Sequence, residues 1–243
     1  MGKPLIGITG DYEEAGEFKS RVENEGRYLL REKYVSAIFD CGGAPVILSY
    51  EDDVVIERLD GVLFTGGNFD IPPEISGIKN PSFARRVKPY RTKYELTLFR
   101  KASALRIPML GICGGMQMMA VGMGGKLIGD IGAEVENALQ HEQGGPRDKP
   151  SHKVNVRKDT LLFALTGCEI LEVNSTHHQA VAHGGSAIVC AEAPDGVIEA
   201  IEIPSHPFAL GVEWHPELLY KNHPAHASIF EGFIKACVEY RCK

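Results

Sequence analysis

The stretch LGICGGMQMMA, residues 110–120, places a cysteine among glycines directly after an apolar run. A strand that turns sharply into a helix crowds its backbone, so only small residues fit two positions before and two positions after the apex. Gly111, Cys113 and Gly115 have this spacing. The stretch therefore predicts a nucleophile elbow with cysteine in place of serine. A glycine-rich turn that only packs a helix close to a sheet remains the alternative.

At such an elbow the Cys113 thiol faces the N-terminus of the following helix, which favours the thiolate. The N–H of Gly114 would point toward an oxyanion formed on a substrate carbonyl. A second donor is predicted in LFTGGNFD, residues 63–70, where a strand ends in two glycines. Taken alone, that stretch also fits a plain turn.

A cysteine nucleophile needs a base and a group that orients the base. The segment GVEWHPE, residues 211–217, offers His215 and Glu217 after an apolar strand. Residues i and i+2 of an extended segment point to the same side, so a carboxylate would lie beside the imidazole. A surface His–Glu pair is the alternative. The polar context of six other histidines predicts solvated side chains for His141, His152, His183, His206, His223 and His226.

Around these motifs, strands alternate with helices, which is typical of an α/β protein with a parallel sheet covered on both faces. The first half predicts strands over 4–10, 44–50, 61–67 and 107–113, and helices over 27–41, 53–59, 90–106 and 114–123. Short alternating runs in the second half, the last of them at 208–214, predict added, partly antiparallel strands. A C-terminal helix follows, with Ile229, Phe230, Phe233 and Cys237 on one face.

Composition limits the class of protein. A chain of 243 residues with 44% hydrophobic residues fits one domain over 1–243. The net charge of −6 gives no basic field for nucleic acid or an anionic membrane. No apolar run approaches the roughly 20 residues of a membrane span, and no secretory leader is recognised. Six scattered cysteines predict a reducing, cytoplasmic setting without disulfides, all but Cys113 being small structural residues.

Taken together, these segments resemble the class I glutamine amidotransferase-like family, most closely its γ-glutamyl-γ-aminobutyrate hydrolase branch. The block RTKYELTLFRKASALRIPMLGICGGMQMMAVGMGGKLIGDI, residues 91–131, follows that branch without a gap. EVNSTHHQAV (172–181), APDGVIEAIE (193–202) and GVEWHPE follow in the same order. The resemblance implies a flavodoxin-like central sheet, mostly parallel, with helices on both faces and an added, partly antiparallel region.

The resemblance also implies roles for individual residues. Cys113 would be the nucleophile, His215 the general base and then acid, and Glu217 the group that orients the ring. Gly67 and Gly114 would donate the backbone N–H groups of the oxyanion hole.

The remaining site residues follow from the same resemblance. Gln117 would hold the glutamyl moiety, and the segment 174–178, with Ser175, Thr176 and His177, would bind the α-amino and α-carboxylate ends of the substrate. The adjacent His177 and His178 lack a third ligand at helical or hairpin spacing, so no metal is expected. No organic cofactor is expected either.

The expected function is a stand-alone hydrolase of γ-glutamyl amides that acts through a γ-glutamyl thioester on a small-molecule substrate. The alternative is a glutaminase subunit that passes ammonia to a separate synthetase, which would then be its partner. A non-catalytic binding protein is disfavoured by the intact Cys113, His215 and Glu217. A homo-oligomer is left open.

Four positions depart from the branch. Gly114 occupies the position where the branch usually has an arginine, Ala120 that of an asparagine, and Glu213 that of a glutamine. In addition, two residues rather than one separate Gly67 from Asp70. Losing the arginine predicts looser selectivity at the leaving-group end of the substrate. The competing hypothesis is that another arginine replaces it, with Arg85, Arg86 and Arg91 as candidates.

Overall fold

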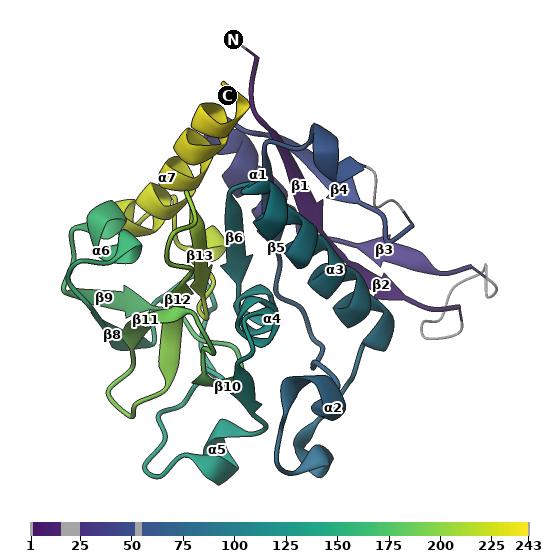
Figure 1. Cartoon of the computed structure of the whole chain (residues 1–243). Helices are drawn as coiled ribbons and strands as arrows, with labels where there is room; N and C mark the ends of the chain where they lie inside the picture. Colours follow the sequence, from purple (N-terminus) through teal and green to yellow (C-terminus); the bar gives the residue numbers. More distant parts are fainter. Residues whose placement is uncertain (1, 16–24, 52–54, 243) are drawn as a thin grey trace.

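A twisted central sheet with helices on both faces forms the molecule (Figure 1). The computed structural model describes residues 2–15, 25–51 and 55–242. One half of the sheet is parallel, with neighbouring strands in the order β4 (Ala44–Leu48), β1 (Leu5–Thr9), β5 (Gly61–Phe64), β6 (Met109–Ile112) and β13 (Ala209–Val212). Counted along the chain, this is the 2-1-3-4-5 order of a flavodoxin-like sheet, in which ligands bind beyond the carboxyl ends of the strands. The fold class predicted from the sequence is confirmed.

The other half of the sheet is antiparallel, as the sequence predicts. The strands continue from β13 in the order β12 (Ile198–Glu202), β11 (Ile188–Glu192), β8 (His152–Val156) and β9 (Ile170–Val173). β10 (Ala180–His183) pairs with both β12 and β7 (Lys126–Ile128). The expectation that 208–214 belongs to this added region is wrong, because β13 pairs parallel with β6 and completes the parallel half.

Helices cover both faces of the parallel half. α1 (Glu32–Asp40) and α7 (Pro224–Arg241) share one core, and α3 (Pro89–Leu105) and α4 (Gly114–Gly122) share the other. The strands feed both cores by alternation: on β5, Leu63 packs with the first pair of helices, and Val62 and Phe64 pack with the second. The shorter helical segments are α2 (Pro73–Ser76), α5 (Ile131–Glu134), α6 (Leu161–Thr166), η1 (Val55–Arg58), η2 (Pro81–Phe83) and η3 (Pro216–Leu218).

The helix predicted over 27–41 begins later than expected. Residues Arg27–Leu29 form β3, which pairs with β2 (Asp11–Glu13) in a separate two-stranded sheet. Tyr28 lies opposite Tyr12, with ring centroids 5.1 Å apart, and its hydroxyl accepts a hydrogen bond from the Tyr50 N–H at 3.0 Å. These aromatic cross-strand contacts outweigh the helical spacing. The helix predicted over 53–59 is the 3-10 turn η1, and residues 53 and 54 lie outside the described residues.

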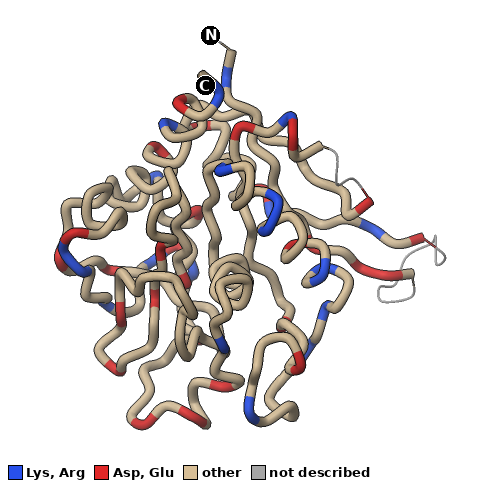
Figure 2. Tube along the Cα trace, viewed as in Figure 1, with Lys and Arg blue, Asp and Glu red and all other residues tan. Residues whose placement is uncertain are grey.

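Lys and Arg residues alternate with Asp and Glu residues along the described part of the chain (Figure 2). None of the helices described is both long and apolar enough to cross a membrane. All six cysteines are free thiols. Cys190 and Cys237 are buried as predicted, whereas Cys242 is exposed.

Helix α4 starts directly at the end of β6 and packs very close to the sheet. A Cβ atom on Gly115 would lie 2.2 Å from the carbonyl oxygen of Phe64 on β5. A Cβ atom on Gly111 would lie 2.9 Å from the carbonyl carbon of Gly115. Both clashes involve backbone atoms, which side-chain rotation cannot relieve. Glycine at 111 and 115 is therefore required by the contact between α4 and the sheet.

We expect Gly115→Ala to lower the free energy of unfolding by about 1–3 kcal/mol, because the added methyl group pushes α4 away from β5. Gly144→Ala is the matched control, since a Cβ atom at Gly144 meets nothing within 4 Å. Its effect should stay within about 0.5 kcal/mol. Urea unfolding of both variants measures the difference. Equal stability of the two variants would show that the packing of α4 against β5 does not require glycine at position 115.

Candidate active site

Cys113 is the N-cap of α4, at the carboxyl end of the central strand β6. Its backbone has φ 52° and ψ −114°, a conformation that side-chain-bearing residues seldom adopt. Such backbone costs roughly 1–3 kcal/mol and persists only where the surrounding structure enforces it. The Cys113 N–H donates to the Val212 carbonyl at 2.8 Å, which fixes the turn to β13. The sharp strand-to-helix turn predicted from the glycine spacing is present.

His215 and Glu217 lie beside this turn as a hydrogen-bonded pair. The His215 Nδ1 atom is 2.7 Å from Glu217 Oε1, and both side chains are buried. The expected extended backbone is wrong: Glu217 lies within the 3-10 turn η3, for which Pro216 supplies the first residue. The predicted contact therefore forms through a tight turn.

The imidazole of His215 also lies near enough to the Cys113 side chain for the two groups to interact electrostatically. Burial disfavours the protonated ring, but the charges of Glu217 and Cys113 outweigh burial and raise the pKa of His215 to about 10. The ring therefore carries a proton at neutral pH, between a carboxylate and a sulfur.

Two residues whose role has no signal in the sequence hold this pair in place. The side chain of Asn174 accepts from the His215 N–H at 2.8 Å and donates to the His215 carbonyl at 3.1 Å. The hydroxyl of Tyr34, on α1, lies 3.5 Å from His215 Nδ1 and accepts from the Gly66 N–H at 3.1 Å. Burial, then the charges of Glu217 and Cys113, raises the pKa of Tyr34, so the phenol keeps its proton.

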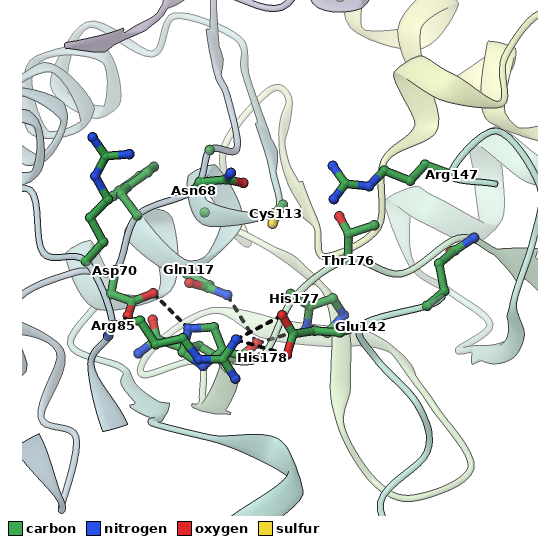
Figure 3. Close-up of a pocket in the computed structure, with 16 residues that line it drawn as sticks. Asn68, Asp70, Arg85, Cys113, Gln117, Glu142, Arg147, Thr176, His177 and His178 are labelled. Atoms are coloured by element: carbon green, nitrogen blue, oxygen red, sulfur yellow. Dashed lines mark hydrogen bonds and ion pairs between the residues drawn. The ribbon is translucent and has the colours of Figure 1, made fainter. Parts of the chain in front are cut away.

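A cavity of about 460 Å³ opens in front of Cys113 (Figure 3). Of the residues that the sequence assigns to substrate contacts, Gly67, Gly114, Gln117, Thr176 and His177 line it. Ser175 does not line it: its hydroxyl is fully buried and donates to the His141 carbonyl at 2.7 Å. His178 lines the cavity too, and its Nε2 atom is 3.0 Å from Asp70.

The side-chain amide of Gln117 is hydrogen-bonded to Glu213. The amide nitrogen donates to Glu213 Oε1 at 2.6 Å and to the Gln179 carbonyl at 3.3 Å. Glu213 is fully buried, and burial, followed by the charges of Cys113 and Glu199, raises its pKa well above the usual value. The carboxyl of Glu213 therefore stays neutral and adds no negative charge near the Cys113 sulfur.

The space beside Gly114 is filled by Phe69. A Cβ atom on Gly114 would lie 3.2 Å from Phe69 Cζ, and one on Gly67 would lie 2.8 Å from Phe69 Cδ1. The same ring covers the guanidinium of Arg91 at 3.9 Å. Phe69 belongs to the two-residue spacer before Asp70, so the longer loop occupies space next to the missing arginine side chain.

Three arginines line the cavity, and one of them is unexpected. Arg85 forms ion pairs with Asp130 and Glu142, at 3.1 and 2.9 Å, and Arg86 also lines the cavity. Arg91 does not: it is buried against Glu95. Arg147 lines the cavity without an ion pair to any residue in the described ranges, and Figure 3 places its side chain near Thr176.

The prediction that the other histidines are solvated is wrong for three of them. His141 and His226 are buried, and the side chain of His152 is 8% exposed, with its Nε2 atom 3.0 Å from Glu199. The Nε2 atom of His226 is 3.0 Å from the Glu172 carbonyl, and Trp214 donates to its Nδ1 atom at 3.3 Å. Burial lowers the pKa of His226 to about 4. Polar neighbours along the chain do not reveal these long-range contacts.

Known proteins resemble this chain over its whole length. The family described as peptidase C26 matches residues 4–217. The γ-glutamyl-γ-aminobutyrate hydrolase of Escherichia coli K12 is 32% identical, over 98% of this chain and 94% of its own. A glutamine amidotransferase-like protein of Rickettsia prowazekii is 32% identical over 96% and 98%.

Solved structures support the fold. The glutaminase domain of Trypanosoma brucei CTPS with bound acivicin has a TM-score of 0.65 at 15% identity, covering 98% of this chain and 94% of that one. A glutamine amidotransferase of Thermotoga maritima has a TM-score of 0.59 at 15% identity, covering 98% of both chains.

We expect the His215 ring to remain cationic at pH 8, because Glu217 and Cys113 stabilise its proton. Nitrogen-15 NMR of the imidazoles measures this, and His226 should stay neutral in the same spectrum. Since the folded-state pKa of about 10 exceeds the unfolded value of about 6.5, the stability that the pair contributes is complete below pH 6.5 and lost as pH rises through 10.

Glu217→Gln is the matched variant for this measurement, since it keeps the shape of the side chain and removes its charge. The pKa of His215 should fall. An unchanged pKa would mean that Glu217 does not stabilise the imidazolium.

Proposed function

The chain belongs to the peptidase C26 family, and we propose that it hydrolyses γ-glutamyl amide bonds with Cys113 as nucleophile. The observation that carries the proposal is Cys113 in the wall of the cavity, with the imidazole of His215 near enough to interact with its charge and 2.7 Å from Glu217. A nucleophile, a proton carrier and a group that orients the carrier are the three parts that acyl transfer needs.

In the first half-reaction, the Cys113 sulfur attacks the γ-carbonyl carbon of the substrate. The raised pKa of His215 supports a resting thiolate–imidazolium pair, so no base has to act before attack. The developing oxyanion would accept hydrogen bonds from the backbone N–H groups of Gly67 and Gly114. The C–N bond breaks as the His215 proton moves to the departing amine, which leaves a γ-glutamyl thioester on Cys113.

In the second half-reaction, His215 is neutral and acts as a base. It takes a proton from water, and the hydroxide attacks the thioester carbonyl. The C–S bond breaks, glutamate leaves, and the thiolate and the imidazolium are restored. Glu217 would keep its hydrogen bond to Nδ1 throughout and so hold the ring in one orientation.

The cavity also suggests how the two ends of the substrate are recognised. Its volume of about 460 Å³ suits a dipeptide-sized molecule. Gln117, with its amide nitrogen held by Glu213, would offer its carbonyl oxygen to the glutamyl α-ammonium. Thr176 would contact the same end. Arg147 would bind a carboxylate on the leaving amine, as γ-aminobutyrate carries.

The second candidate function is a glutaminase that passes ammonia to a synthetase, favoured by the glutamine amidotransferase-like relative. Activity of the isolated chain separates the two functions. A hydrolase should release glutamate from γ-glutamyl amines without a partner. A glutaminase that depends on a synthetase should be nearly inactive until the synthetase is added.

We expect Cys113→Ala to abolish turnover with the fold intact, because the glycines rather than the thiol set the turn. His215→Asn should lower kcat by several orders of magnitude, and Glu217→Gln by less, since the amide still holds the ring. Released glutamate is the readout, and circular dichroism checks folding. Substantial turnover by folded Cys113→Ala would remove Cys113 from the mechanism.

We expect Arg147→Ala to lower kcat/KM for γ-glutamyl-γ-aminobutyrate about ten- to a hundredfold relative to a γ-glutamyl alkylamine of equal length. Losing one charge-assisted hydrogen bond costs about 1.5–3 kcal/mol, which is this ratio. Arg157→Ala is the control, because Arg157 pairs with Glu192 and does not line the cavity. If the wild type already accepts both substrates equally, the absence of arginine at 114 has loosened selectivity and Arg147 does not compensate.

A further inference from the structure

Behind the cavity wall, three imidazoles converge on the buried carboxylate of Glu199. The Oε1 atom of Glu199 is 3.0 Å from His152 Nε2, 3.3 Å from His141 Nδ1 and 3.8 Å from His177 Nε2. The ligand-type atoms of His141, His152 and Glu199 all lie within 4.8 Å of one another. The four residues come from separate segments of the chain, so no short motif reveals the cluster.

The other ring nitrogens of two of these histidines are held by acceptors that face away from Glu199. His141 Nε2 is 2.9 Å from Asp195 Oδ2, and His177 Nδ1 is 2.9 Å from the Gln179 carbonyl. When these nitrogens donate, the nitrogen on the far side of each ring presents a lone pair toward Glu199. A metal-bound histidine has this arrangement, in which a carboxylate or carbonyl fixes the tautomer from behind.

Two buried atoms of the cluster have no hydrogen-bond partner in the described ranges. They are His177 Nε2 and Glu199 Oε2. An unsatisfied buried polar atom costs about 1–3 kcal/mol. A cation bound by His177 Nε2 and by both carboxylate oxygens of Glu199 would satisfy the two atoms together.

We propose that His141, His152 and Glu199 bind one Zn²⁺ ion, and that His177 Nε2, which is 3.8 Å from Glu199 Oε1, moves closer to become the fourth ligand. Bonds of about 2.0–2.1 Å in a tetrahedral site separate neighbouring ligand atoms by about 3.3 Å. The distances from Glu199 Oε1 to His152 and His141 are near this value, whereas His177 lies farther away. Three imidazoles with one carboxylate suit Zn²⁺, whereas Mg²⁺ and Ca²⁺ favour oxygen ligands alone.

The ion would add a further link between segments of the chain, two of which already meet where the His177 N–H donates to the His141 carbonyl at 3.1 Å. Glu199 lies on β12 and His152 on β8, while His177 follows β9 and His141 lies in the loop before β8. That loop also carries Gln143 and Arg147, which line the cavity. The metal would therefore hold one wall of the cavity against the antiparallel half of the sheet, with a structural role and no part in the chemistry at Cys113.

The competing occupant is a proton. His141 lies between the carboxylates of Asp195 and Glu199, and an imidazolium there would satisfy both. It would leave His177 Nε2 without a partner among the described residues. A protonated cluster and a metal-bound cluster therefore differ in whether they bind a cation in fixed proportion.

The test is a titration of the untagged, chelator-treated protein with Co²⁺, followed by Zn²⁺. We expect one equivalent of Co²⁺ to give the visible absorption of a four-coordinate ion, and Zn²⁺ to displace it and raise the melting temperature. His152→Asn should weaken Zn²⁺ binding at least tenfold, and Glu199→Gln should also weaken it. His183→Asn is the matched control and should bind as the wild type does.

Cys113→Ala separates this site from the proposed catalytic residues, because a cysteine and a histidine could also bind Co²⁺. Binding should be retained in Cys113→Ala. If no stoichiometric binding occurs in the wild type, the cluster is held by a proton and the proposal fails. It also fails if binding is lost in Cys113→Ala and kept in folded His152→Asn.

Discussion

The passage from β6 into α4 through the single residue Cys113 is the constraint on which the site depends. Because the helix starts at the end of the strand, its first turn lies on the backbone of β5, and Gly111 and Gly115 leave the room for that contact. The same passage forces Cys113 into positive φ. Packing energy from two cores holds this conformation, so the unfavourable backbone at Cys113 depends on the whole α/β architecture.

The sequence predicts what depends on short spacing. Glycines two residues on either side of Cys113 indicate a tight turn, and the turn is there. His215 and Glu217 are predicted to touch, and they do, although through a 3-10 turn rather than an extended strand. The predicted start of α1 is wrong because the contact of Tyr28 with Tyr12 joins residues on two strands, beyond the reach of helical periodicity.

What the sequence does not predict depends on contacts across the fold. In the sequence, Tyr34 occupies one of the apolar positions of the predicted helix. In the fold, its hydroxyl lies beside His215. Asn174 is expected in the pocket with its neighbours, whereas it holds the backbone of His215 on both sides. His141 stands in a polar loop but is buried between acidic groups. In each case a polar side chain has a distant partner that no local pattern encodes.

The contact between Phe69 and Gly114 bears on how this site could diverge from its relatives. Any side chain at 114 would start 3.2 Å from the Phe69 ring, and that ring also covers Arg91. The longer loop and the glycine at 114 are thus sterically coupled, although they are separate changes in the sequence. Placing arginine at 114 by itself would meet the aromatic ring, and shortening the loop by itself would uncover Arg91. A variant with only one of the two changes would therefore be less stable than either arrangement. Divergence between this site and that of its relatives requires both changes.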